Sequence, residues 1–80
     1  METSIITIHV FIEIDRRRQE KVEFHSAEVT GRQIKEKAGI PLGDDLARRS
    51  GQKLEPIAND QVVTLKDGEH FVALPPGTVS

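Results

Sequence analysis

Aliphatic and polar residues alternate along the first strand-like segment of the chain. Between Ile6 and Ile14 every even position is aliphatic, whereas most odd positions are polar. Period-two alternation with many β-branched residues is typical of a strand that buries one face. The alternation resumes at residues 21–25 after a polar break at residues 15–19. The two segments therefore predict an antiparallel hairpin.

One helix is predicted, and it begins after Thr30. Thr30 and Gln33 have the spacing of a capping box, in which each residue satisfies a backbone N–H of the other. Ile34 and Ala38 lie four residues apart and share a face. Gly39 stands where a left-handed C-terminal cap is wanted. A helix of about 8–9 residues is marginal in water, so we expect it to pack against the sheet.

The second half of the chain predicts a second hairpin and a last strand. Strand-like residues 46–49 and 53–54 flank a Gly-containing turn and form the hairpin. An apolar segment follows at 62–65, which is either a strand or a packed loop. Turn residues at 66–69 lead to a strand at 70–74, which Pro75 and Pro76 end. Four or five short strands with one helix on one face give an α+β fold.

Composition limits this chain to one small domain. The sequence has 80 residues, of which 36% are hydrophobic and 30% are charged, so it can build one modest core and no deep cavity. The lack of cysteine excludes disulfides, thiolate metal sites and cysteine nucleophiles. A net charge of −2 and the lack of Trp and Tyr argue against nucleic acid as a partner.

The N-terminus and the apolar runs bear on location. No apolar run approaches the ~20 residues that span a membrane, and the N-terminus lacks the basic region of a signal peptide. We therefore expect a soluble, cytoplasmic chain without a membrane partner.

No residue pattern predicts catalysis or a resident cofactor. His9, His25 and His70 each fall in a predicted strand, and strand pairing could bring His9 and His25 together. A metal site needs three or four converging ligands, so we predict none. No serine stands in a nucleophile elbow, and no glycine-rich phosphate loop is present. We predict that the chain is not an enzyme.

Two basic runs and the C-terminal segment remain as candidate interaction sites. Residues 16–18 and 48–49 are arginine runs that acidic neighbours dilute, which favours solvated turns over a binding site for an acidic partner. The C-terminal segment passes from Leu74 through two stiff prolines to Gly77, a residue with no side chain to obstruct an approaching active site. The alternative to such a functional end is a frayed terminus or an interdomain linker.

The order of elements resembles the ubiquitin-like β-grasp, and the chain as a whole is similar to the bacterial multiubiquitin family. The resemblance rests on "VTGRQIKEKAGI" at Val29–Ile40 and on "DGEHFVALPPG" at Asp67–Gly77. It implies a mixed sheet of four to five strands packed on one helix. It also implies one domain over residues 1–77, with a flexible tail at 75–80 that serves as a processing or linker segment.

The resemblance implies a protein modifier. An activating (E1-like) enzyme would use ATP to adenylate the C-terminal carboxylate, and a conjugating (E2-like) enzyme would pass the modifier to a target protein through an isopeptide bond. A processing peptidase would expose the conjugated end, for which Gly77, Thr78 and Ser80 are the candidates. The modifier itself would hold no cofactor and no metal. Arg48, Arg49 and Leu74 are the predicted partner-binding surface.

Two features depart from ubiquitin. The chain has Gly77 followed by Thr78, Val79 and Ser80 in place of two terminal glycines, and the strand that carries part of ubiquitin's apolar patch reads Leu-Ala-Arg-Arg at residues 46–49.

The alternative functions to a protein modifier are a non-conjugated β-grasp adaptor and a sulfur-carrier protein, and the sulfur carrier would need a terminal glycine carboxylate. The lysines that could accept another copy are Lys21, Lys35, Lys37, Lys53 and Lys66.

Overall fold

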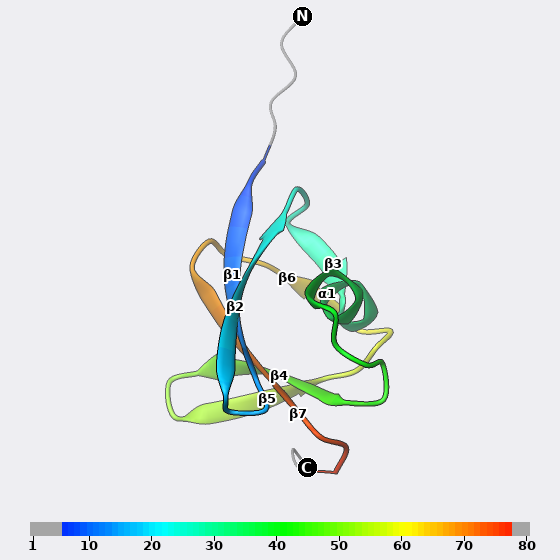
Figure 1. The fold of residues 1–80 in the computed structure, drawn as a ribbon. Coiled ribbons are helices and arrows are strands. Elements are labelled where there is room, and N and C mark those ends of the chain that lie inside the picture. Colours follow the sequence, from blue (N-terminus) through cyan, green and yellow to red (C-terminus); the bar gives the residue numbers. More distant parts are fainter. Residues whose placement is uncertain (1–5, 78–80) are drawn as a thin grey trace, which may run out of the picture.

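The computed structural model describes residues 6–77, which form seven strands and one helix (Figure 1). The elements are β1 (Ile8–Ile14), β2 (Arg18–Phe24), β3 (Glu28–Thr30), α1 (Gly31–Ala38), β4 (Asp45–Ser50), β5 (Lys53–Ile57), β6 (Val62–Thr64) and β7 (Glu69–Leu74). Among these residues no helix has the length and apolar character needed to cross a membrane.

Five strands form one mixed sheet in the order β2-β1-β7-β4-β5. β1 and β7 are parallel, and the other neighbouring pairs are antiparallel. The helix packs on one side of this sheet, beside a separate ladder of β3 and β6 (Figure 1). The fold is therefore the predicted α+β β-grasp. The apolar segment at 62–65 provides β6, whereas β3 had no counterpart among the predicted strands.

The β1–β2 hairpin turns through residues in an uncommon backbone conformation. Asp15 and Arg16 have φ of 53° and 58°, and the Arg17 N–H donates to the Ile14 carbonyl at 3.1 Å. Positive φ at both central residues is the pattern of a type I′ turn, which matches the twist of hairpin strands. β2 begins at Arg18, three residues earlier than the alternation predicted. The first four residues of β2 are all exposed at the sheet edge, so neither face needs apolar side chains and the sequence does not alternate there.

The predicted capping box begins α1. The Gln33 N–H donates to Thr30 Oγ1 at 3.2 Å, and the Thr30 N–H donates to Gln33 Oε1 at 2.8 Å. Gly39 ends the helix with φ of 74°, a conformation that glycine adopts without steric cost. Both predicted ends of the helix are thus confirmed.

The core lies between the helix and the inner face of the five-stranded sheet. Its largest fully buried side chains include Phe71, Ile12, Ile34, Leu46 and Val10, each at 2% exposure or less. Ala73 is the last residue of β7 that belongs to this core cluster. The next residues of the chain leave the sheet.

Candidate functional site at the chain exit

The C-terminal segment leaves the middle of the sheet, at the same end as the β1–β2 turn (Figure 1). β7 lies between β1 and β4, and its last residues pair with Ile14 on one side and Asp45 on the other. The Asp15 N–H also donates to the Ala73 carbonyl at 2.9 Å. The exit point is therefore held from both sides, and a tail that starts there has a fixed base.

Pro75, Pro76 and Gly77 follow β7 and are exposed. Gly77 has φ of 82°, and a Cβ at this position would find no atom within 4 Å. A side chain at residue 77 would therefore meet no clash, but it would strain the backbone, because residues other than glycine rarely adopt this φ. Thr78 and Ser80, the other candidates for the processed end, lie outside the described residues.

Arg48, a predicted partner-binding residue, is engaged by other groups of the domain. Its side chain is 27% exposed, and its guanidinium lies 5.7 Å from the centroid of the Phe71 ring. Its Nε lies 3.2 Å from a Glu69 carboxylate oxygen, and its Nη2 donates to the Thr64 carbonyl at 2.8 Å. Arg48 covers the edge of the core, because its long side chain packs its stem and pairs its charge there.

Arg49 and Leu74 lie on the outer face of the sheet, away from the helix. Arg49 is 47% exposed and forms an ion pair with Glu13 at 3.5 Å. Leu74 is only 3% exposed, so it offers a partner little of its side chain. Leu74, Val72 and Ala47 are buried yet stand outside the core cluster, because strand alternation turns them to this second face. The side chains at the centre of the outer face are therefore covered by their neighbours and are almost inaccessible to solvent.

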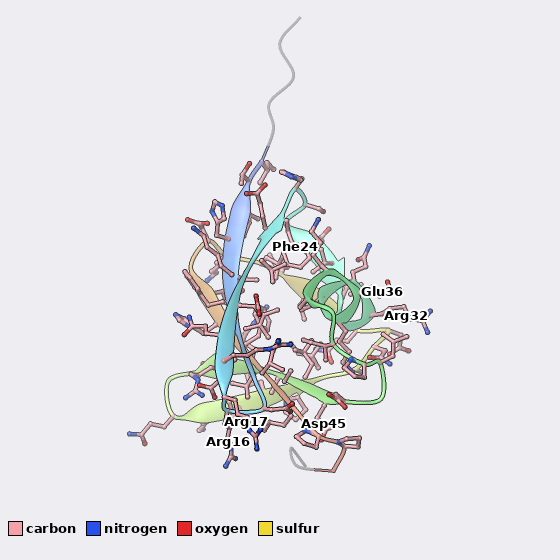
Figure 2. The ribbon with its side chains drawn as sticks, in the orientation of Figure 1. Arg16, Arg17, Phe24, Arg32, Glu36 and Asp45 are labelled. Carbon is pink, nitrogen blue, oxygen red and sulfur yellow. The ribbon has the colours of Figure 1, made fainter. Side chains whose placement is uncertain are left out.

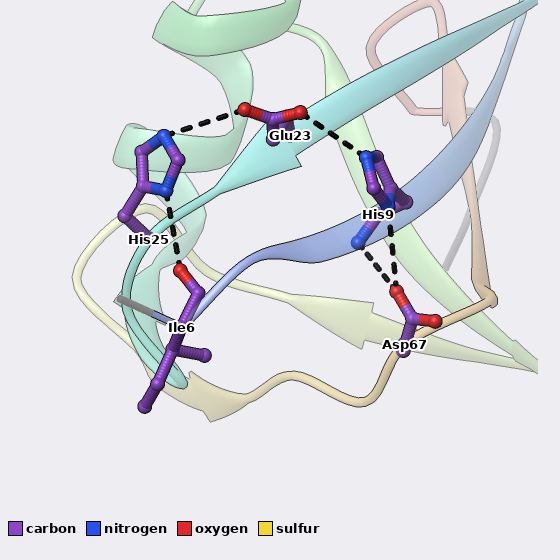
Figure 3. Close-up of polar contacts among 5 residues, drawn as sticks. All are labelled: Ile6, His9, Glu23, His25 and Asp67. Atoms are coloured by element: carbon purple, nitrogen blue, oxygen red, sulfur yellow. Dashed lines mark hydrogen bonds and ion pairs between the residues drawn. The ribbon is translucent and has the colours of Figure 1, made fainter. Parts of the chain in front are cut away.

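Strand pairing brings His9 and His25 to one carboxylate (Figure 3). His9 Nε2 lies 3.1 Å from Glu23 Oε1, and His25 Nε2 lies 3.4 Å from Glu23 Oε2. Asp67 Oδ1 accepts the backbone N–H of His9 at 2.8 Å. No group of three or more ligands in the described part of the chain has the arrangement of a metal site. The cluster joins β1 to β2 and to the loop before β7.

The structure places the arginines of the β1–β2 turn beside the chain exit, which sequence reasoning did not predict. Asp15, Arg16 and Arg17 line a hollow of about 440 Å³ together with Leu74 and Pro75. The sequence marked residues 16–18 as basic, but it carried no sign that this turn and the tail meet. Their proximity depends on the parallel pairing of β1 and β7, whose residues are far apart in the chain.

The chain matches a family model described as Multiubiquitin over residues 13–75. The chain belongs to the multiubiquitin family. No curated protein and no solved structure matches it. Multiubiquitin domains are ubiquitin-like, which agrees with the mixed sheet and single helix described above. The matched region ends at Pro75, so family membership rests on the folded domain and not on Gly77.

Proposed function

We propose that this chain is a bacterial ubiquitin-like protein modifier, or one unit of a multiubiquitin chain. It is activated at its C-terminus by an ATP-dependent E1-like enzyme and transferred by an E2-like enzyme to a target protein. The observation that carries the proposal is that the C-terminal tail leaves the sheet of a multiubiquitin domain from a firmly paired strand. β7 is paired on both sides, and the next residues reach an exposed glycine.

The geometry allows the partner enzymes to act on the tail while the folded domain is only recognised. A partner can hold residues 75–77 in an extended channel while the folded domain stays outside, because those residues are exposed and the sheet ends at Leu74. Gly77 brings no side chain to the point where a catalytic group must approach. The domain then supplies a handle and a recognition surface, and the reacting groups belong to the enzymes.

The proposed chemistry balances without a cofactor bound to this chain. A peptidase hydrolyses the bond between Gly77 and Thr78 and leaves a glycine carboxylate. That carboxylate attacks the α-phosphate of ATP held by the activating enzyme, so an acyl-adenylate forms and pyrophosphate leaves. An enzyme nucleophile displaces AMP to form an enzyme-bound ester. A target amine then displaces the enzyme and forms an amide.

Intact-mass spectrometry after co-expression with the activating, conjugating and peptidase-like enzymes tests this proposal. We expect loss of residues 78–80 or a covalent adduct at the C-terminus. Gly77→Val should abolish the adduct, because a branched side chain blocks the channel next to the reacting carboxylate. Gly68→Val is the matched control, since Gly68 has a similar φ of 83° and a Cβ there also finds no atom within 4 Å. An unmodified chain beside enzymes that do modify another family member would contradict the proposal.

The exposed Arg16 and Arg17 favour a second candidate, a non-conjugated adaptor that binds a partner through its surface. Removal of residues 76–80, which leaves Pro75 of the hollow in place, separates the two functions. An adaptor keeps its partner without this segment, whereas a modifier loses every covalent product.

A further inference from the structure

The hollow at the chain exit combines positive charge with an apolar wall. We call it the exit hollow; its lining residues are Asp15, Arg16, Arg17, Leu74 and Pro75. Figure 2 shows the Arg16 and Arg17 side chains extending from the end of the hairpin where β7 also ends. Pro75, which is exposed, and the small accessible part of Leu74, which is 3% exposed, form the apolar wall. A ligand in the exit hollow would therefore meet guanidinium groups and hydrocarbon together.

The charges of Arg16 and Arg17 are available to a ligand. Other arginines near them are engaged by carboxylates, with separations of 3.8 Å for Arg18, 3.2 Å for Arg48 and 3.5 Å for Arg49. Within residues 6–77, neither Arg16 nor Arg17 has a carboxylate oxygen within 4.0 Å, and both residues are exposed. Asp15 lines the same hollow and offsets part of their charge. Two guanidinium groups and one carboxylate thus line the hollow, on a chain whose net charge is −2.

The backbone beneath these arginines is fixed in a conformation that costs free energy. Asp15 and Arg16 both have positive φ, which side chains other than glycine rarely adopt. Two backbone hydrogen bonds hold the turn, from Arg17 to Ile14 at 3.1 Å and from Asp15 to Ala73 at 2.9 Å. Residues held in such conformations cluster at binding and active sites. The backbone that carries the two guanidinium groups is thus ordered before a ligand binds, so binding has to order only the arginine side chains.

We propose that the exit hollow is a docking site for an acidic segment of a partner protein, with carboxylates on Arg16 and Arg17 and an apolar side chain against Leu74 and Pro75. The planar guanidinium fork matches a carboxylate in a bidentate arrangement. Charge complementarity of this kind sets orientation and speeds association. The inference goes beyond the proposed function, because an acidic partner can dock here whether or not the C-terminus is activated.

A protein fits this site better than a nucleic acid does. Single-stranded nucleic acid is held by basic grooves with aromatic side chains for base stacking. No phenylalanine lines the exit hollow. Phe24 and Phe71 are buried, and the Phe11 ring is stacked on His70 with their centroids 5.2 Å apart. Two free arginines beside an acidic residue also give too little charge for strong phosphate binding.

A heteronuclear NMR titration of the full chain tests the docking site. The probe is a short peptide of alternating Glu and Leu, and a Lys and Leu peptide of the same length is the negative probe. We expect the acidic peptide to shift the amide signals of Arg16, Arg17 and Leu74 most, with binding that weakens as salt rises. Arg16→Glu with Arg17→Glu should weaken binding by about tenfold or more through charge repulsion. The neutral Arg16→Gln with Arg17→Gln variant should weaken it less.

Arg32→Glu is the matched control, because Arg32 is an exposed arginine on α1 outside the exit hollow (Figure 2). It should bind the acidic peptide as the unaltered chain does. Unchanged affinity in both double variants, or shifts spread away from the exit hollow, would overturn the proposal. So would tighter binding of a single-stranded oligonucleotide than of the acidic peptide. The amide spectrum of each variant shows directly whether the fold is kept.

Discussion

At the scale of single residues, a buried ammonium group joins the helix to two loops. Lys35 is 3% exposed, and its Nζ donates to the Leu42 carbonyl at 3.1 Å, the Asp44 carbonyl at 2.5 Å and Asn59 Oδ1 at 2.7 Å. Three acceptors use all three donors of an ammonium. Lys35 is therefore closed to a second copy of the chain, and its place among the acceptor lysines is wrong. The other candidates, Lys21, Lys37, Lys53 and Lys66, are exposed.

We expect Lys35→Met to lower the free energy of unfolding by about 2–3 kcal/mol, because it leaves buried acceptors without the charged donor. Urea denaturation followed by circular dichroism measures the change. Lys37→Met, at an exposed position of the same helix, should change stability by less than about 0.5 kcal/mol. Equal stability of the two variants would show that the Lys35 contacts contribute nothing.

At the scale of elements, the start of α1 is fixed by its approach to the loop between β5 and β6. The Gly31 N–H donates to the Gln61 carbonyl at 3.0 Å, and the Arg32 N–H donates to the Asn59 carbonyl at 2.9 Å. A Cβ on Gly31 would collide with the carbonyl oxygen of Ala58, a backbone atom that cannot rotate away. The glycine of the Thr-Gly-Arg segment is required by this contact.

Gly31→Ala should therefore destabilise the chain by about 2 kcal/mol, as overpacking of a closed site does. Helix propensity alone predicts the opposite sign, since alanine is favoured over glycine by up to about 1 kcal/mol. Thermal unfolding distinguishes the two. Gly43→Ala, where a Cβ finds open space, is the control and should be near neutral. A stabilised Gly31→Ala variant would mean that the Ala58 carbonyl moves aside at little cost.

Elements whose signals lie within a short segment of the sequence could be predicted. Elements that depend on pairing between distant segments could not. The capping box, Gly39 and the two hairpins were readable because their residues are neighbours in the chain. β3 has three residues and pairs with β6, so it offers too few positions for a periodic signal. The exit hollow was also beyond prediction, because Arg16 and Leu74 meet only through the parallel pairing of β1 and β7. Burial of Leu74 likewise required the three-dimensional packing.

At the scale of the whole molecule, the outer sheet face combines an ion pair with apolar side chains, since Phe11 and Leu54 share this face with Arg49. Ala47 and Val72 are buried at its centre, and the Glu13–Arg49 ion pair lies on the same face. The large exposed apolar residues of the described chain are on different elements and form no continuous surface: they are Ile6, Leu42, Leu54 and Val62. A partner for this face must match polar groups.

We therefore expect no binding to a ubiquitin-binding module of the kind that contacts ubiquitin through its apolar patch. Such a module would have to desolvate the Glu13–Arg49 pair without replacing it. An NMR titration with the labelled module and this chain measures the interaction, and ubiquitin itself is the positive control. Saturable binding at the concentrations that saturate with ubiquitin would contradict this expectation.

The parallel pairing of β1 and β7 also determines how the domain responds to force. The start of β1 and the end of β7 lie at opposite ends of the molecule (Figure 1), so tension between them slides the two strands along each other. Sliding strains the hydrogen bonds of the ladder together, whereas peeling would break them one at a time. A pull applied between the start of β1 and the end of β7 would therefore load this central ladder first. Resistance to pulling is governed by the unfolding rate under load and not by the equilibrium free energy. The clamped strand makes this small domain a stiff mechanical element in any chain that contains it.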